Sequence, residues 1–133
     1  MSDLFRWPVR IYYEDTDHSG VVYHANYLRF FERARSEWLR ARGQSHTVLE
    51  HEHGAAFTII DLSIRYAKPA RIDDALEATV RIAHRSAASL TFEQTLIRPE
   101  DPANPLARAT IRVVCVDATS FKPRPWPAGW LDP

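Results

Sequence analysis

A change in hydrophobic period divides this chain into one helical segment and several strand segments. Over residues 26–42 the apolar side chains recur at helical spacing, as shown by Tyr27, Phe31, Ala34, Trp38 and Ala41. Asn26 is a candidate N-cap, and Gly43 lies where a left-handed residue commonly ends a helix. The pattern predicts one long, well-buried helix over residues 26–42.

Alternation with a period of two predicts strands on both sides of this helix. A first strand is expected over residues 7–13, and residues 44–54 are expected to form a polar loop. Four more strands are expected, with inward positions Ile60, Leu62, Ile64 and Tyr66; Leu76, Ala78, Val80 and Ile82; Leu90, Phe92 and Leu96; and Ala109, Ile111, Val113 and Cys115. The connections are too short for crossover helices, so consecutive strands are expected to pair antiparallel as a meander.

These elements predict an α+β fold in which one long helix lies on the apolar face of an antiparallel sheet. The chain has 133 residues, of which 45% are hydrophobic, and this is enough for one compact core. Residues 1–133 are therefore expected to form a single domain. Its proline-rich tail, from about residue 121, is expected to run extended over the surface.

Charge, cysteine and glycine content exclude several classes of protein. The 17 basic and 17 acidic residues give a net charge of zero, which argues against a general nucleic-acid partner. A single cysteine, the lack of a signal-peptide pattern and the lack of a long apolar run lead us to expect a cytoplasmic protein. The four glycines are too scattered for a phosphate-binding glycine loop.

Residues that could carry chemistry are concentrated in the segment YYEDTDHSGVVYHANY, residues 12–27. A calcium loop built from Asp15 and Asp17 would need a bidentate glutamate where Asn26 stands. A transition-metal site built from Asp17, His18 and His24 would lack any recurring ligand spacing. The third hypothesis is metal-free catalysis at a strand-to-helix junction.

This third hypothesis depends on the free backbone N–H groups at the start of a helix. The amide of His24 is placed to polarise a carbonyl oxygen, as in an oxyanion hole. Asp17, on a loop that must fold back across Gly20, could then act as nucleophile or general base. The alternative is that Asp17 only caps a turn, and the residue types are compatible with either a catalytic or a structural role.

Several runs resemble a known family. VRIYYEDTDHSGVVYHANYLRFFERARSE (residues 9–37), RYAKPARIDD (65–74), SLTFEQTLIR (89–98) and ATIRVVCVDATSFKPRPWP (109–127) are similar to hot-dog-fold acyl-CoA thioesterases of the 4-hydroxybenzoyl-CoA thioesterase type. They resemble most the subgroup encoded beside the Tol-Pal system. The resemblance implies an antiparallel sheet wrapped around a long central helix. It also implies hydrolysis of acyl-CoA to a free acid and coenzyme A.

The resemblance assigns roles to particular residues. Asp17 matches the catalytic carboxylate, His24 matches both the polarising amide and a catalytic side chain, and Tyr13, expected to point inward, completes this set. Asp15 is expected to be structural. The phosphates of coenzyme A are expected to bind the basic residues after the second predicted strand, Arg65, Lys68 and Arg71.

Further residues and properties are also expected. Asp61 is an alternative carboxylate that a neighbouring subunit could supply, and the aromatic residues Tyr27, Phe30, Phe31 and Phe57 line an acyl pocket or belong to the core. The resemblance implies no metal or other cofactor, and it implies a homotetramer built from dimers. Two other functions stay open: a hot-dog enoyl-thioester hydratase, and a non-catalytic acyl-thioester-binding module linked to the inner membrane or to an acyl carrier protein.

Overall fold

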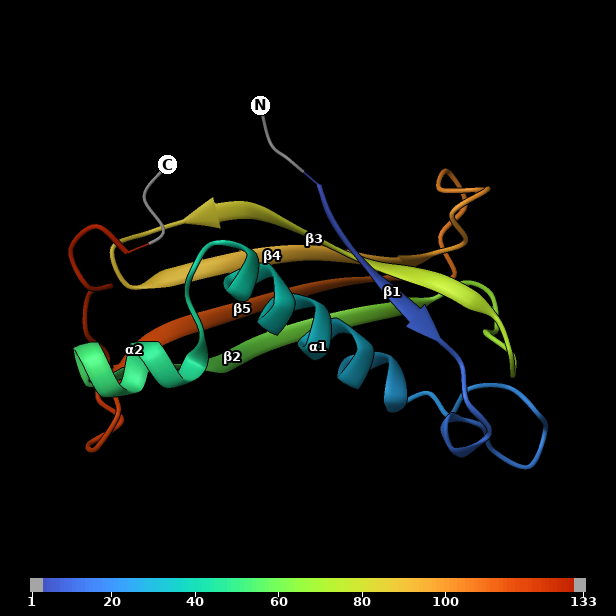
Figure 1. The fold of residues 1–133 in the computed structure, drawn as a ribbon, viewed down its shortest axis with the longest axis horizontal. Helices are drawn as coiled ribbons and strands as arrows, with labels where there is room; N and C mark the ends of the chain where they lie inside the picture. The colour runs from blue at the N-terminus through green and yellow to red at the C-terminus, as the bar shows by residue number, and fades with distance from the viewer. Residues whose placement is uncertain (1–3, 131–133) are drawn as a thin grey trace.

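The computed structural model describes residues 4–130, which form an antiparallel sheet with helix α1 on one face (Figure 1). Its five strands lie in the order β1-β3-β4-β5-β2. The elements are β1 (Phe5–Arg10), the short 3-10 turn η1 (Tyr13–Asp15), α1 (Asn26–Ala41), α2 (His46–His53), β2 (Ala55–Tyr66), β3 (Ala75–Arg85), β4 (Ser89–Ile97) and β5 (Ala107–Asp117). The predicted α+β fold is confirmed. The ends of the predicted domain, residues 1–3 and 131–133, lie outside the described residues.

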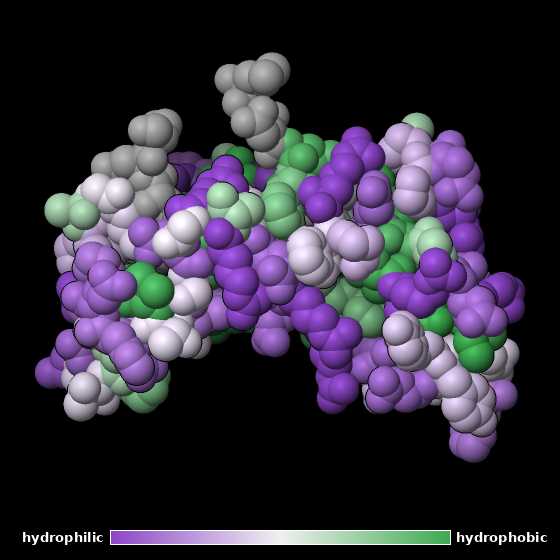
Figure 2. All heavy atoms as spheres, viewed as in Figure 1, coloured by the Kyte–Doolittle hydropathy of each residue, from purple (hydrophilic) through white to green (hydrophobic). Residues whose placement is uncertain are grey.

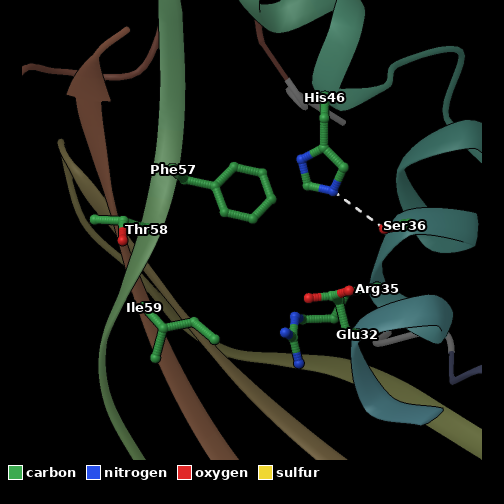
Figure 3. A pocket seen from close by; sticks show the side chains of 7 residues that line it. All are labelled: Glu32, Arg35, Ser36, His46, Phe57, Thr58 and Ile59. Carbon is green, nitrogen blue, oxygen red and sulfur yellow. Dashed lines mark hydrogen bonds between the residues drawn. The ribbon is translucent and has the colours of Figure 1, made fainter. Parts of the chain in front are cut away.

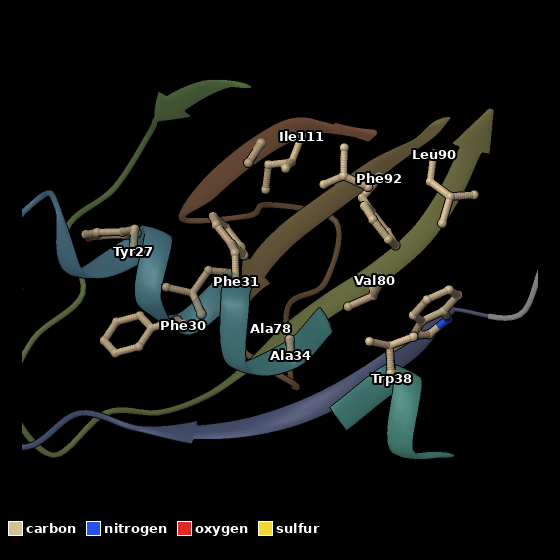
Figure 4. Packing of buried hydrophobic residues seen from close by; sticks show 14 of the residues in the cluster. Tyr27, Phe30, Phe31, Ala34, Trp38, Ala78, Val80, Leu90, Phe92 and Ile111 are labelled. Carbon is tan, nitrogen blue, oxygen red and sulfur yellow. The ribbon is translucent and has the colours of Figure 1, made fainter. Parts of the chain in front are cut away.

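Helix α1 packs its apolar face on β3, β1 and β4. The Trp38 ring meets the Phe92 ring edge-on, with ring centroids 5.3 Å apart (Figure 4). On the opposite side, hydrophilic side chains run along the helix (Figure 2). Gly43 has φ +75° and donates its N–H to the Arg40 carbonyl, as expected of a residue that ends a helix. The predicted helix therefore differs from α1 by only one residue at its end.

The predicted meander is correct for β3, β4 and β5 but wrong for the other two strands. β1 pairs with β3, and β2 pairs with β5 at the far edge of the sheet. The connection from β2 to β3 is held at Ala70, whose N–H donates to Tyr27 Oη (3.0 Å) and whose carbonyl accepts from the Val22 N–H (2.8 Å). The connection therefore crosses the end of the sheet and does not turn back as a hairpin.

Strand β2 begins earlier than predicted and contains a β-bulge between Ile59 and Asp61. Before the bulge, Ile59 lies opposite Val113, and after it Leu62 lies opposite Ile111. The extra residue thus keeps Ile59 and Leu62 on the same, inner face of the sheet. Ile60, which was expected to point inward, is 50% exposed because it is the bulged residue.

The polar loop predicted over residues 44–54 is wrong, because α2 occupies most of it. The Ser45 hydroxyl accepts the N–H of Val48 (3.0 Å) at the start of this helix, and Gly54 ends it with φ +63°. Only Leu49 of α2 is buried. The two caps stabilise a helix whose hydrophobic pattern alone is weak.

The proline-rich segment after β5 forms no helix or strand within residues 118–130, as its prolines predict. It packs on the end of the core through Trp126 and Trp130, whose rings stack with centroids 4.6 Å apart. Among the described residues, no helix has the length and apolar content needed to cross a membrane.

Candidate active site

The loop between β1 and α1 folds back on itself through a tight turn at Asp17. The Asp17 N–H donates to the Val21 carbonyl (2.9 Å), and the Gly20 N–H donates to the Asp17 carbonyl (3.1 Å). Gly20 has φ +80°, a conformation that strongly favours glycine. The expected role of Gly20 in turning the chain is therefore seen directly.

The Asp17 carboxylate is partly engaged by this turn. Its Oδ1 accepts from the Ser19 N–H (2.9 Å) and from the Ser19 hydroxyl (2.6 Å). These bonds, with the hydroxyl contributing most, lower the pKa of Asp17 below its ordinary value of 3.8, so the group is ionised at neutral pH. Its Oδ2 makes no hydrogen bond to another described residue, so one carboxylate oxygen stabilises the turn and the other is available.

Asp15 and Asn26 join this loop to the start of α1. Asp15 Oδ2 accepts the N–H of Tyr12 (2.8 Å), and its carbonyl accepts from the Tyr23 N–H (2.9 Å) and from Asn26 Nδ2 (3.0 Å). Asp15 therefore has the structural contacts expected of it. Asn26 is not the N-cap, since that position belongs to Ala25 and the Asn26 side chain turns back toward the loop.

His24 lies two residues before the first residue of α1, among aromatic rings. Its carbonyl accepts from the Tyr66 hydroxyl (2.7 Å), and its ring centroid lies 4.6 Å from that of Tyr23. Its backbone N–H donates to no acceptor within residues 4–130. This N–H and the nearby helix start supply a site of positive potential at which a carbonyl oxygen could be polarised.

The predicted catalytic residues line two different depressions. Tyr13 and Asp17 line one of about 650 Å³, whereas His24 lines another of about 290 Å³. The prediction that Tyr13 points inward is wrong, because its side chain is 82% exposed. β1 ends at Arg10 and Tyr13 begins η1, so the alternation of the strand no longer determines where this side chain points.

The three predicted phosphate-binding residues are also separated. Arg65 lies opposite Arg108 on the outer face of the sheet, Lys68 lines the same depression as His24, and Arg71 bridges to Val21 of the loop. Asp61 lies opposite Arg112 on the outer face of β2. Within residues 4–130, no group of three potential metal ligands gathers at one point.

Two further cavities lie between α1 and β2, and their polar lining residues are not among the predicted site residues. They measure about 480 Å³ and about 140 Å³, and they share Glu32, Arg35 and Ile59 as lining residues. Figure 3 shows the Arg35 guanidinium extending from α1 toward Ile59, with His46 and Phe57 at the other end. Together these spaces are called the α1–β2 cavities.

Arg35 is held in place by a buried polar network. Its Nη1 donates to Gln94 Oε1 (2.8 Å), and Gln94 Nε2 donates to the carbonyls of Phe31 (3.1 Å) and Thr79 (3.2 Å). Two sequence signals could have found this pair. Gln94 falls on the inward parity of β4, and Arg35 lies one helical turn after Phe31, on the buried side of α1.

Comparison with known proteins agrees with this fold. A family model for the thioesterase-like superfamily matches residues 11–132. The acyl-CoA thioester hydrolase YbgC of Escherichia coli O6:H1 is 47% identical over 124 residues, which cover 93% of this chain and 90% of that protein. The acyl-CoA thioesterase YbgC of Haemophilus influenzae is 44% identical over 123 residues, covering 92% and 88% of the two chains.

Solved structures agree as well. A probable thioesterase from Bartonella henselae superposes with a TM-score of 0.87 and 35% identity, covering 94% of this chain and 100% of that one. A 1,4-dihydroxy-2-naphthoyl-CoA thioesterase from Synechocystis superposes with a TM-score of 0.86 and 28% identity, and the match covers 96% of this chain and 93% of that one. The expected hot-dog fold is confirmed. Because the family model, the relatives and the structures each cover almost the whole chain, this protein belongs to the thioesterase-like superfamily.

Proposed function

We propose that this chain hydrolyses acyl-CoA thioesters to a free acid and coenzyme A. The observation that carries the proposal is the ionised and exposed carboxylate of Asp17, which lies on the same loop before α1 as the unpartnered backbone amide of His24, although the two residues line different depressions of the single chain. The names of the relatives support the same substrate class. The predictions that the enzyme is cytoplasmic and needs no cofactor stand beside this proposal.

In the proposed mechanism the His24 N–H donates to the thioester oxygen, which polarises the carbonyl. The free Oδ2 of Asp17 then follows one of two routes. It attacks the carbonyl carbon and expels the thiolate, leaving a mixed anhydride that water opens, or it removes a proton from a water molecule that attacks that carbon. Either route gives one acid and one thiol. Tyr13, in the same depression as Asp17, is proposed to orient the reacting group.

Thiol release from short, long and aromatic acyl-CoAs tests this mechanism. Asp17→Asn keeps an oxygen that can accept from Ser19, so the turn is preserved while the carboxylate is lost. We expect kcat/KM to fall by roughly 10²-fold or more. His24→Ala keeps the backbone N–H and should reduce the rate less, by the contribution of the imidazole alone.

Asp61→Asn is the matched control, since Asp61 lies on the outer face of β2. A fully active Asp17→Asn variant would contradict the assignment of the carboxylate. If only Asp61→Asn loses activity, the catalytic carboxylate comes from β2. Failure of the wild type to release thiol from any acyl-CoA would favour the non-catalytic binding module.

For the coenzyme A phosphates we propose Lys68, with Arg65 and Arg71. Lys68 is the strongest of the three because it lines the depression that also holds His24. Lys68→Ala should raise KM for an acyl-CoA several-fold but leave KM unchanged for the matching N-acetylcysteamine thioester, which has no phosphates. An equal rise for both substrates would show that Lys68 acts on the thioester part instead.

We also propose that the chain assembles through β2 into dimers, and that two dimers form a homotetramer. β2 is an edge strand with an unpaired side, and its apolar residues Ile59, Ile60 and Leu62 are between 39% and 50% exposed. Such an edge readily pairs with a second copy of the same chain. Association with the inner membrane or with an acyl carrier protein stays a prediction.

A further inference from the structure

Arg35 is a charged residue in an unusual position. Its side chain lies on the side of α1 that faces the sheet, and the residue is only 6% exposed. Burial lowers its pKa to about 10, which still leaves it protonated at neutral pH. Its one hydrogen bond is to the neutral Gln94, and no carboxylate among the described residues forms an ion pair with it. The carboxylate of Glu32 acts on it only through the field that partly restores its pKa, without an ion pair, and a buried cation held this loosely is costly, so another role is indicated.

The α1–β2 cavities give this cation access to a ligand. Arg35 lines both of them, together with Glu32 of the same helix. The β2 side of the cavities is largely apolar: Phe57 and Ile59 line the larger one (Figure 3), and Leu62 lines the smaller one. The result is a space with an apolar wall on one side and, on the other, the opposite charges of Glu32 and Arg35, which both cavities share, with Arg29 added at the smaller cavity.

The two charges that both cavities share, Glu32 and Arg35, restrict which group can bind between them. The guanidinium only donates hydrogen bonds, and the carboxylate only accepts them. A ligand carboxylate would face repulsion from Glu32, and a ligand ammonium would face repulsion from Arg35. A hydroxyl group can accept from Arg35 and donate to Glu32 at the same time. It is therefore the group that matches both residues.

We infer that the α1–β2 cavities bind the acyl part of the thioester and that Arg35 and Glu32 recognise a hydroxyl group on it. This inference rests on the proposed thioesterase function. The smaller cavity reaches Leu28, close to the start of α1 where the thioester carbonyl is proposed to bind. Glu32 and Arg35 lie about 9 Å and 14 Å farther along the helix axis than Asn26. The recognised hydroxyl is therefore far from the carbonyl, near the end of a medium-length chain.

Matched pairs of substrates test this inference. Thiol release is measured for octanoyl-, decanoyl- and dodecanoyl-CoA and for each ω-hydroxy counterpart. For at least one chain length we expect kcat/KM to favour the hydroxylated member by about 10- to 100-fold, as for a hydrogen bond to a charged group. Equal rates within every pair would overturn this inference alone. No thiol release from any substrate would overturn the proposed function as well.

Variants of Glu32 sharpen the test without disturbing the core, because this side chain is exposed. In Glu32→Gln the preference for the hydroxylated member should fall several-fold. Turnover of the matching ω-carboxyacyl-CoA should rise, because the repelling charge is gone. Glu37→Gln is the control: Glu37 is on the same helix, pairs with Arg40 and lines neither cavity. An equal change in the two variants would overturn the inference.

Discussion

The inner face of the sheet has two halves that are built differently. Under α1, the strands β1, β3 and β4 are covered by close packing such as that of Trp38 on Phe92. Beyond α1, β5 and β2 border the α1–β2 cavities, and β2 exposes apolar side chains at the sheet edge. The first half stabilises the fold, whereas the second leaves space and unsatisfied surface for ligands and partners.

The largest difference between the halves should appear on truncation of large side chains. Trp38→Ala removes a side chain that is almost fully buried, and it should lower the free energy of unfolding by roughly 3–5 kcal/mol. Leu62→Ala, at the partly exposed wall of the cavities, should cost about 1 kcal/mol or less. Urea denaturation at several protein concentrations measures both values, and similar losses at the two positions would remove the distinction.

Gln94 lies on the packed half, where it accepts a hydrogen bond from Arg35. The Arg35 side chain lines the α1–β2 cavities of the other half. Gln94→Met removes three hydrogen bonds and leaves the Arg35 cation without its hydrogen-bond partner, so a loss of roughly 2–4 kcal/mol is expected. The double variant with Arg35→Met should be less destabilised than the sum of the single variants. Additive losses in denaturation would mean that the two side chains are not coupled.

The exposed edge of β2 predicts an effect on assembly with little effect on the fold. Ile60→Lys places a charge on the bulged residue and should disperse the proposed oligomer in sedimentation velocity. The unfolding free energy of the separated chain should change by only about 0.5 kcal/mol. Thr110→Lys, on the outer face of β5, adds the same charge away from the edge. A wild type that sediments as a single chain would contradict the proposed assembly.

The smallest expected effect concerns the turn at Asp17. Ser19→Ala removes the hydroxyl that most lowers the pKa of Asp17, so this pKa should rise toward 3.8. A lowered pKa in the folded state favours folding above pH 3.8, and this contribution is lost as the pH falls through the folded value. NMR titration of the carboxyl carbon should show the upward shift. Ser63→Ala on β2 is the control, and an unchanged Asp17 pKa in Ser19→Ala would contradict the role of the hydroxyl.

The packed half could be predicted well from the sequence because its patterns are local and regular. Of the inward residues predicted for β3, Leu76, Ala78 and Val80 are buried and Ile82 is partly buried, and those predicted for β5 are all buried. The helical spacing of Phe31 and Trp38 located α1 within one residue at its end. In a strand or helix with one buried face, a shift of one residue would expose the whole apolar set, so the pattern fixes which residues point inward.

The open half was predicted less well, because its structure depends on long-range strand pairing and a bulge, which a local sequence pattern does not contain. The pairing of β2 with β5 joins strands far apart in the sequence, and the bulge at Ile60 shifts the alternation within a single strand. In the candidate site, the turn at Asp17 and the position of His24 before α1 follow from glycine and helix signals. The direction of Tyr13 does not, since it depends on where β1 ends.

The bulge in β2 has a consequence for how this chain tolerates changes of length. Phe57 and Ile59 face the cavities in one alternation, and Leu62 faces them in the other. Deleting Ile60 would remove the bulge and leave Phe57, Ile59 and Leu62 in one regular alternation, so all three would still face the cavities. A related chain that lacks this single residue would therefore keep the same cavity wall. Strand β2 thus tolerates the loss of one residue at this point but not in its regular part, where such a loss would turn the side chains beyond it to the other face.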